Sequence, residues 1–582
     1  MTGIFNSSNY SQRLDNAWAD ETMNNWPKPS VSVAEAVVKM LEKLGVKHSF
    51  GVSGGAIARL WHNLQQSSIE VIHCRHESGA AFAATEAYFA NDCPTVVFTT
   101  TGPGITNALT GLMAARWEGA KVILLSGMTS TAQRGRWAVQ ETGPNTMPYA
   151  DIFTTGTIFD YATTLENSDQ LPEISRRLAN GLTQPGSFVA HISIPSAIQS
   201  SLSKTPLSQT FLSQSLATAN EETVAECAKL LSEAPFAIWV GFGARKAAAA
   251  IRQLAEQTGA AVMCSPRGKG IFPENHPQFV GVTGFAGHES VLRYMQEYRP
   301  LRTLVLGSRL GEATSFYNPR MVPARGFIHV DIDPKVPGIA YPEAETIGIQ
   351  SDVEIFVRAL LKYFPEHPKH LSHIDLPTSE RKAIAAKTEG LIRPEFLMQA
   401  IQQQIVENSD AVVMAGAGNS FAWAIHHLQF NDSERFRVST WFGSMGHFTT
   451  GVVGAGMVNM RKAVAIVGDG SMLMNHEVST AVRYNISAVW IILNDQLYNM
   501  CNQGQAMQGF KGTDAMIPQT DFALLARSMG AEFIRVERES DIYTTLEKVK
   551  SSEKPFIIDV LIDPTKIAPI GSRIESLNSQ WT

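Results

Sequence analysis

Two acidic residues in the last third of the chain each follow an apolar run that is typical of a buried strand. Asp469 lies in Gly-Asp-Gly-Ser after AVAIVG, and Asp495 follows AVWIILN. The carboxyl ends of neighbouring parallel strands open on the same edge of a sheet, so we expect the two carboxylates to meet there. Such oxygen ligands suit Mg²⁺, which commonly shares its sites with phosphates, and glycines let backbone N–H groups approach a phosphate. The pattern predicts a metal–diphosphate site.

A third acidic residue opens a stretch that is otherwise small and apolar. Glu77 begins ESGAAFAATEAY, a run that predicts a helix packed closely on another element. Burying a lone carboxylate there is costly unless the group is protonated, paired or hydrogen-bonded. A glutamate at a helix start is also a common charge at the positive end of the helix dipole. The residue alone leaves a chemical role and a capping role open.

The composition excludes several classes of protein. The chain has 582 residues, 44% hydrophobic and 18% charged, with a net charge of -6, so no basic field favours nucleic acid. Its five cysteines are scattered without a CxxC pair, which indicates reduced thiols of a cytoplasmic protein. The first thirty residues lack the apolar core of a signal peptide, and no apolar run is long enough to span a membrane.

Three blocks of the chain repeat the order strand, glycine turn, helix, strand. This order predicts α/β architecture with three doubly wound parallel-sheet domains. Polar stretches separate the blocks and indicate linkers. The expected organisation is a flexible arm at 1–30, domains at 31–200, 218–363 and 391–570, and a C-terminal tail at 571–582.

Together these motifs resemble those of thiamine-diphosphate enzymes in the branch of acetolactate synthases and pyruvate decarboxylases. RHESGAAFAATEAY is similar to the segment with the catalytic glutamate, and TTTGPGITNALTGL to the glycine turn beside the active site. WFGSMGHFTTG is similar to the segment that holds the two cofactor rings. The resemblance implies that the three domains are the pyrimidine-binding, central and diphosphate-binding domains of this family.

The resemblance also implies site residues and cofactors. The cofactors would be thiamine diphosphate and Mg²⁺, with Glu77 sharing a proton with the aminopyrimidine and Gln140 as a second catalytic residue. Met445 would support the bent cofactor, although an ordinary core methionine fits the same pattern. The residues expected at the cofactor are Gly102, Asn419, Ser420, Gly443, Met445, Asp469, Gly470, Ser471 and Asp495, and the metal ligands would be Asp469, Asp495 and the carbonyl of Leu497.

One departure leaves the second metal ligand open. The family usually has Asn-Asn where this chain has Asn494-Asp495, and the spacing from Asp469 is one residue short. Asp495 is the ligand if the missing residue lies in the helix between them, and Asn494 is the ligand otherwise. In the family the glutamate and the diphosphate site come from different subunits, which implies a homodimer or homotetramer.

The reaction is inferred from further stretches. Simple pyruvate decarboxylases are expected to carry paired histidines where AARWEGAK has Trp117 and Glu118. Their absence, with Gln140 and RHES, favours decarboxylation of a 2-oxo acid followed by carboligation to a second one. A simple decarboxylase and a non-catalytic cofactor-binding relative remain as alternatives.

Two features bear on the ligands. GSRLGEATSFYN departs from the usual flavin-contacting stretch, so FAD is not expected. Four tryptophans near the motifs suggest either a pocket for aromatic 2-oxo acids or ordinary packing: Trp117, Trp137, Trp423 and Trp441.

Overall fold

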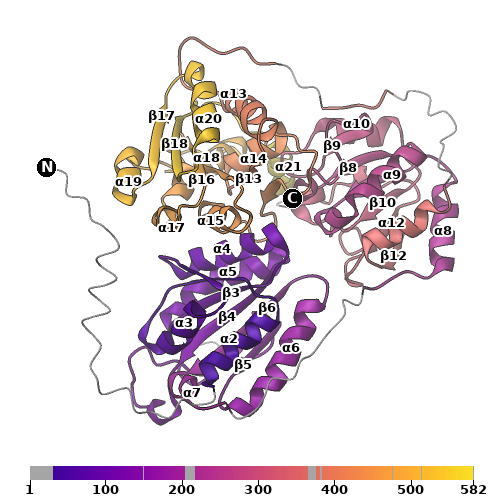
Figure 1. Ribbon diagram of the computed structural model, residues 1–582. Helices are drawn as coiled ribbons and strands as arrows, with labels where there is room; N and C mark the ends of the chain where they lie inside the picture. Colours follow the sequence, from indigo (N-terminus) through magenta and orange to yellow (C-terminus); the bar gives the residue numbers. More distant parts are fainter. Residues whose placement is uncertain are drawn as a thin grey trace.

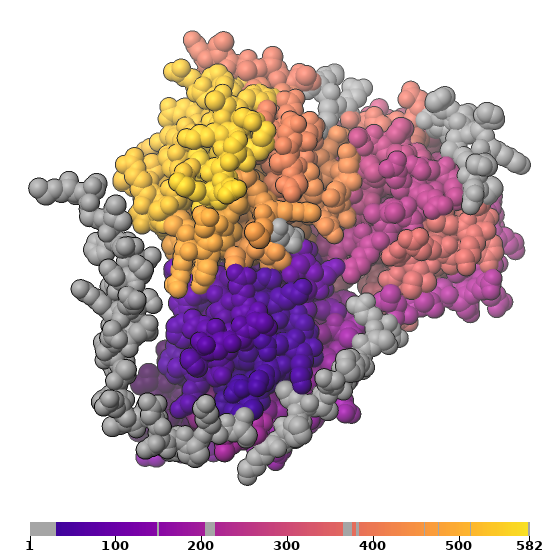
Figure 2. Space-filling model, in the orientation of Figure 1, coloured from indigo at the N-terminus to yellow at the C-terminus, as the bar shows by residue number. Residues whose placement is uncertain are grey.

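The computed structural model describes residues 31–147, 150–203, 216–364, 375–379, 383–474, 476–512 and 514–580, so the arm expected at 1–30 lies outside it. The described chain forms three six-stranded parallel sheets flanked by helices, as the sequence predicts (Figure 1). The first and third domains abut each other, with the central domain beside them (Figure 2). All five cysteines are free thiols. Among the described residues no helix is long and apolar enough to cross a membrane.

The first sheet is built around apolar runs that are buried along their whole length. Its strands lie in the order β2 (Glu70–His73), β1 (His48–Gly51), β3 (Thr95–Thr99), β4 (Lys121–Met128), β6 (Phe188–Pro195) and β5 (Tyr161–Thr164). The flanking helices are α2 (Val33–Lys43), α3 (Ala58–Gln65), α4 (Glu77–Asn91), α5 (Pro103–Glu118), α6 (Leu171–Thr183) and α7 (Ser196–Gln199).

The central sheet has the strand order of a dinucleotide-binding fold, and the strands Ala237–Val240 and Thr303–Leu306 pair where the order reverses. The Gly243 amide donates to the Gly307 carbonyl at 2.9 Å, and a Cβ on Gly241 would lie 2.4 Å from the same oxygen. Its strands are β12 (Thr346–Gln350), β11 (Phe327–Asp331), β10 (Thr303–Leu306), β7 (Ala237–Val240), β8 (Ala261–Cys264) and β9 (Phe279–Val282). Its helices are α8 (Glu221–Leu231), α9 (Ala248–Thr258), α10 (Glu289–Glu297), α11 (Glu312–Ser315) and α12 (Val353–Leu361).

The third sheet repeats the strand order of the first. Its strands are β14 (Phe436–Val438), β13 (Val412–Ala415), β15 (Ala463–Gly468), β16 (Ala488–Asn494), β18 (Phe556–Leu561) and β17 (Glu532–Val536). Its helices are α13 (Pro394–Ile401), α14 (Asn419–His427), α15 (His447–Asn459), α16 (Asp469–Met472), α17 (Val478–Tyr484), α18 (Asn499–Met507), α19 (Phe522–Met529) and α20 (Ile542–Ser551). A further helix, α21 (Gly571–Gln580), lies in the expected tail. The order of the sheet reverses between β13 and β15, which is where ligands bind in such sheets.

Helices α4 and α15 join the first domain to the third (Figure 1). Their small residues allow a close approach. A Cβ on Gly454 would lie 1.9 Å from the Ala83 carbonyl oxygen, and one on Gly451 would lie 2.8 Å from Glu86 Cγ. The small apolar run after Glu77 therefore serves the packing of two domains, and residues larger than glycine at these two positions would force the helices apart.

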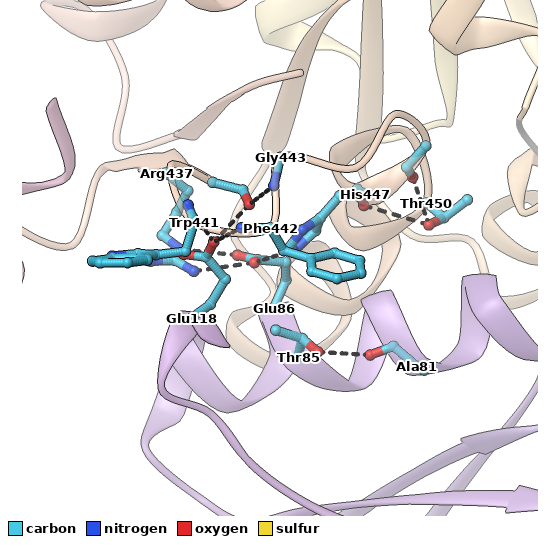
Figure 3. Close-up of polar contacts among 12 residues, drawn as sticks. Ala81, Thr85, Glu86, Glu118, Arg437, Trp441, Phe442, Gly443, His447 and Thr450 are labelled. Carbon is cyan, nitrogen blue, oxygen red and sulfur yellow. Dashed lines mark hydrogen bonds and ion pairs between the residues drawn. The ribbon is translucent and has the colours of Figure 1, made fainter. Parts of the chain in front are cut away.

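Buried charged side chains also stabilise this contact between the first and third domains. The Glu86 carboxylate accepts hydrogen bonds from Arg437 Nε at 2.9 Å and from His447 Nε2 at 2.9 Å (Figure 3). Burial by itself would raise the pKa of Glu86, but the charge and hydrogen bonds of Arg437 and His447 lower it to about 2. The carboxylate is therefore ionised and paired at neutral pH, where it links α4 to both β14 and α15.

Substituting Glu86 by glutamine is expected to destabilise the fold by about 3–5 kcal/mol, because Arg437 would be left buried without its counter-charge. The wild-type carboxyl has a folded pKa of about 2 against an ordinary 4.5, so its contribution is present above pH 4.5 and lost as the pH falls toward 2. Urea unfolding at pH 7 and at pH 3 should show a smaller gap between wild type and variant at the lower pH. Glu35→Gln, in an exposed pair with Lys39, is the control and should change little. Equal denaturation midpoints for wild type and Glu86→Gln would contradict this role.

Candidate active site

Two carboxylates meet where β15 and β16 end. Asp469 follows β15 directly and Asp495 follows β16, and the two strands pair in register up to Gly468 and Leu493. Burial, and then the nearby Asp495, raise the pKa of Asp469 to about 7, and burial raises the pKa of Asp495 to about 6. Two acidic groups that resist ionising together form a site that a divalent cation would stabilise.

The neighbouring Asn494 faces the other side of the strand. Its Nδ2 donates to Asp559 Oδ1 on β18 at 2.8 Å, and both side chains are buried. Successive side chains of a strand point to opposite faces, so only one of the two residues can reach the edge near Asp469. The structure brings Asp495 there, and Asn499 Nδ2 donates to its carboxylate at 2.7 Å.

Three glycines after or at the ends of strands β13, β14 and β15 have open space around them. A Cβ on Gly418, Gly443 or Gly468 would meet no atom within 4 Å. Gly418, with φ +113°, precedes α14 at the switch point of the sheet. Gly470 differs, because a Cβ there would lie 2.6 Å from the Tyr498 ring. The turns can therefore admit a ligand that lies against the backbone, as a diphosphate does.

The first residues of α14 border the same space. Asn419 Nδ2 donates to Gln503 Oε1 at 3.4 Å, whereas its buried Oδ1 has no protein partner. The Ser420 hydroxyl donates to the Gly416 carbonyl at 2.9 Å. A ligand would therefore contact Ser420 through its backbone amide. Ser471, on α16, is buried, and its carbonyl accepts from Thr449 Oγ1 at 3.3 Å.

A buried glutamate from the first domain positions the loop that carries Gly443. Glu118 Oε1 accepts from Ser439 Oγ at 2.6 Å and from the amides of Trp441 and Phe442 at 3.3 and 3.4 Å. Ser439 Oγ in turn accepts from the Gly443 amide at 3.0 Å (Figure 3). This chain of bonds fixes the backbone at Gly443 and at the half-buried Met445 that follows.

From the sequence, Trp117 and Glu118 are expected to occupy the position of the decarboxylase histidines. The structure does not support this interpretation. Glu118 is buried and held by the loop and by Arg267, whose Nη2 lies 3.2 Å from Oε2, so the position is a structural one. The segment that does pack on the glycine turn at Gly102 is 129–147, which contains Gln140 and no histidine.

Glu77 and Gln140 lie at the same end of α5. The buried Glu77 carboxylate accepts from Asn107 Nδ2 at 3.2 Å, and the residue that caps the first turn of α4 is His76. Gln140, with φ +52°, accepts from Thr101 Oγ1 at 3.1 Å through its side chain. Gly102, with φ +53°, begins α5 between them. The structure thus gathers Glu77, Gly102 and Gln140 into one cluster.

This cluster lies apart from the Gly443 loop within one chain, although the residues next to Glu77 contact the third domain. Glu77 and Glu86 lie about 13 Å apart along the axis of α4. Glu86, and not Glu77, contacts His447 at the start of α15. The amides of Arg75 and His76, beside Glu77, instead bind the buried Glu477 carboxylate at 3.1 Å. The expected site residues thus fall into two groups, called half-sites below, and among the described residues no hydrogen bond or ion pair joins one group to the other.

The roles of four polar residues in these half-sites were not predicted from the sequence. These residues are Asn107, Glu118, Glu477 and Asn499, and each acts through a partner that is distant in sequence or one helical turn away. Asn499 could have been found, because it follows Asp495 by four residues at the start of a helix. The other three carry no local signal.

The third-domain residues fit a diphosphate with a hard cation. Among the described residues no group of three or more His, Cys, Asp and Glu side chains is placed to hold a metal. A cation at Asp469 and Asp495 would need further oxygens, such as the Leu497 carbonyl and the phosphates of a ligand, which is a donor set that Mg²⁺ accepts. The open glycine turns and the unpaired Asn419 Oδ1 agree with such a ligand.

The fold defines the class as a three-domain α/β protein, and comparison with known families agrees domain by domain. The thiamine pyrophosphate enzyme N-terminal TPP binding domain matches residues 31–147, the central domain matches 224–360 and the C-terminal TPP binding domain matches 416–560. The chain belongs to the thiamine pyrophosphate enzyme superfamily. These matches support an enzyme that depends on thiamine diphosphate.

Curated relatives align over nearly the whole chain. "Putative thiamine pyrophosphate-containing protein YdaP" of Bacillus subtilis is 26% identical over 91% of this chain and 92% of its own length. "Probable acetolactate synthase large subunit" of Methanocaldococcus jannaschii is 26% identical over 94% of each. The large subunit of acetolactate synthase isozyme 1 of Escherichia coli is 26% identical over 91% of this chain and 94% of its own length.

Proposed function

We propose that this chain is a carboligase of the acetolactate synthase type. It decarboxylates one 2-oxo acid and joins the remaining unit to the carbonyl of a second 2-oxo acid. The pair Asp469 and Asp495 at the switch point of the third sheet supports the cofactor site. Carboligation is supported by the relatives named acetolactate synthase and by Gln140 beside the glycine turn at Gly102. Bound thiamine diphosphate supplies the nucleophilic carbon and accepts the electron pair that the departing CO2 leaves.

In this proposal the third domain holds the cofactor. Asp469, Asp495 and the Leu497 carbonyl would hold Mg²⁺, which would offset the negative charge of a diphosphate there. The amides at the starts of α14 and α16 donate to the phosphates, since helix N-termini stabilise anions. The residues that contact the cofactor are Asn419, Ser420, Gly470 and Ser471 at the diphosphate and Gly443 and Met445 at the rings.

Glu77, Gly102 and Gln140 complete this site from a second copy of the chain. The proposal of a homodimer or homotetramer rests on the separation of the two half-sites in one chain. Exposed apolar side chains beside each half-site are also expected to be buried by another subunit. Near Gln140, Trp137 and Val139 are 96% and 93% exposed. Met516 is 66% exposed where it pairs with Leu497. In such an assembly Glu77 would hold a proton for a ring nitrogen of the cofactor.

We further propose aromatic 2-oxo acids as substrates and no flavin. Trp117 and Trp441 stack with ring centroids 6.1 Å apart beside the Gly443 loop, whereas Trp423 is a buried core residue. The proposed specificity is that of the acyloin-forming enzyme of scytonemin biosynthesis. A flavin is left out because the central-domain stretch GSRLGEATSFYN departs from the usual flavin-contacting stretch. The free cysteines fit a cytoplasmic location.

The test uses the full chain with thiamine diphosphate and Mg²⁺ and a panel of 2-oxo acids, singly and in pairs. One substrate of each pair carries a carbon label outside its carboxyl group. The expected product contains one decarboxylated unit and one second unit, identified by mass. Free aldehyde in amounts equal to the CO2 released would identify a simple decarboxylase, and absence of CO2 from every acid would identify a non-catalytic relative. Products from pyruvate alone would leave the reaction class intact and reject the aromatic substrates.

A further inference from the structure

A cavity of ≈ 420 Å³ lies where the central domain, the third domain and the C-terminal helix meet. The label of α21 in Figure 1 marks this meeting point. Gly418 and Gly443, two of the open glycines of the candidate cofactor site, form one side of the cavity. Glu312, Tyr317, Trp441 and Arg573 line other parts of it. A molecule in this cavity would therefore border the reacting end of the proposed cofactor site.

One cationic side chain in the cavity is held by a rigid element. Arg573 lies on α21, which is anchored in the core by the buried Ile570 and Ile574. Its Nη1 contacts Glu312 Oε1 at 2.7 Å, and both side chains are a little over one third exposed. A guanidinium has five N–H donors, and the contact with Glu312 uses one of its nitrogens. The remaining donors form a fork suited to a ligand carboxylate.

The cavity also offers a flat aromatic wall. Trp441 is 41% exposed and stacks on Trp117 with an interplanar angle of 12°. The Arg309 guanidinium lies 4.9 Å from the centre of the Trp441 ring, which holds the indole from the side of the central domain. Tyr317, on the same wall, is 50% exposed. The exposed parts of Trp441 and Tyr317 provide aromatic surface that another ring can contact edge to face or in an offset arrangement.

The backbone of the central-domain wall is strained. Leu310, Phe316 and Tyr317 have φ values of +50°, +49° and +52°. Bulky residues seldom adopt this left-handed conformation, and it is retained where the surrounding structure or a function requires it. The strained turn places Glu312 and Tyr317 on the cavity together, so the wall has a particular shape rather than that of a generic loop.

We propose that this cavity binds an aromatic 2-oxo acid, with its carboxylate on Arg573 and its ring along Trp441. Glu312 competes with the substrate carboxylate for Arg573 and holds the arginine in place while the cavity is empty. This inference rests on the proposed function and adds the residue that recognises the acid group. Arg573 is a binding residue in this scheme, and no covalent step passes through it.

The test measures binding to the full chain without thiamine diphosphate, so that its result does not depend on catalysis. The probes for calorimetry are phenylpyruvate, phenylacetone, which carries a methyl group in place of the carboxylate, and pyruvate, which lacks the ring. Phenylpyruvate is expected to bind about 10- to 100-fold more tightly than either of the other two, as a charge-assisted contact and a stacked ring predict.

Variants then assign the contacts. Arg573→Met should weaken phenylpyruvate about 10- to 100-fold and leave phenylacetone unchanged, Arg573→Lys should recover part of the loss, and Glu312→Gln should strengthen phenylpyruvate about twofold to fivefold. Arg320→Met, at an exposed arginine of the same domain, is the matched control and should change nothing. In turnover assays Arg573→Met should raise KM for phenylpyruvate with a smaller change in kcat.

Several outcomes would overturn the inference. These are unchanged phenylpyruvate affinity in Arg573→Met, phenylacetone or pyruvate binding as tightly as phenylpyruvate, and displacement of phenylpyruvate by FAD. Carboligation with an unchanged KM in Arg573→Met would reject the role of Arg573 and keep the proposed function. Binding as expected, without any product from the loaded enzyme, would keep the cavity assignment and reject the proposed function.

Discussion

Glu77→Gln is expected to lower turnover about 10²- to 10⁴-fold while the protein stays folded and binds its cofactor. The amide cannot hold the proton that a carboxyl holds opposite the ring nitrogen, but it keeps the shape that contacts Asn107 at the start of α5. Initial rates with a 2-oxo acid pair and titration of thiamine diphosphate separate the two effects. Glu35→Gln, at an exposed helix start, controls for the loss of a surface charge. Near-normal turnover of Glu77→Gln would return this residue to a structural role at the head of α4.

The same variant tests whether the site lies between two chains. Chains with Glu77→Gln have an intact third domain, and chains with Asp469→Ala have an intact Glu77. Random mixing would give mixed dimers with one complete site each, so activity should recover to about one quarter of the wild-type value. Two variants that stay inactive together, although mixed dimers form, would place each site within one chain.

Asp469→Ala is expected to weaken thiamine diphosphate binding on the order of 100-fold or more, and chelation of divalent cations should release cofactor from the wild type. Without a cation, carboxylates at the end of β15 and β16 would face an anionic diphosphate. Equilibrium dialysis with and without chelator measures both effects. Unchanged cofactor affinity after complete removal of divalent cations would show that the metal assignment is wrong.

Two neighbouring variants are the controls for this prediction. Asp495→Ala should behave like Asp469→Ala, because the two carboxylates share the site. Asn494→Ala should keep cofactor affinity and lose stability instead, since it leaves the buried Asp559 carboxylate without its amide partner. The reverse pattern, with affinity lost only in Asn494→Ala, would make Asn494 the ligand.

Most of the architecture could be predicted because it depends on local patterns. Apolar runs such as those of β4 and β15 are buried along their length, and the glycine turns after strands mark the edge where ligands bind. Asp469 and Asp495 could be placed on one edge from the same pattern. The choice between Asn494 and Asp495 could not be made, because it depends on which face of the third sheet each side chain occupies.

Contacts between domains were outside the reach of the sequence. Glu86 with Arg437, and Glu118 with Ser439, join residues that are more than three hundred positions apart. Glu118 precedes a glycine at a helix end and has the pattern of a surface residue, although it is buried. The assignment of Glu77 and Gly443 to different half-sites likewise came only from the resemblance to the family and from no local pattern.

The pairing of β16 limits how the length of this chain can change in evolution. The strand is bonded to β15 and β18 on its two sides up to its last residues. A one-residue insertion or deletion inside it would turn Asn494 toward the cation and bury the charge of Asp495 against Asp559, because side chains alternate between faces. Tolerated length variation between the two acidic residues is therefore expected in the connection between α16 and α17. Homologues whose spacing differs by a residue can thus keep the same ligands, provided that the change falls before the strand begins.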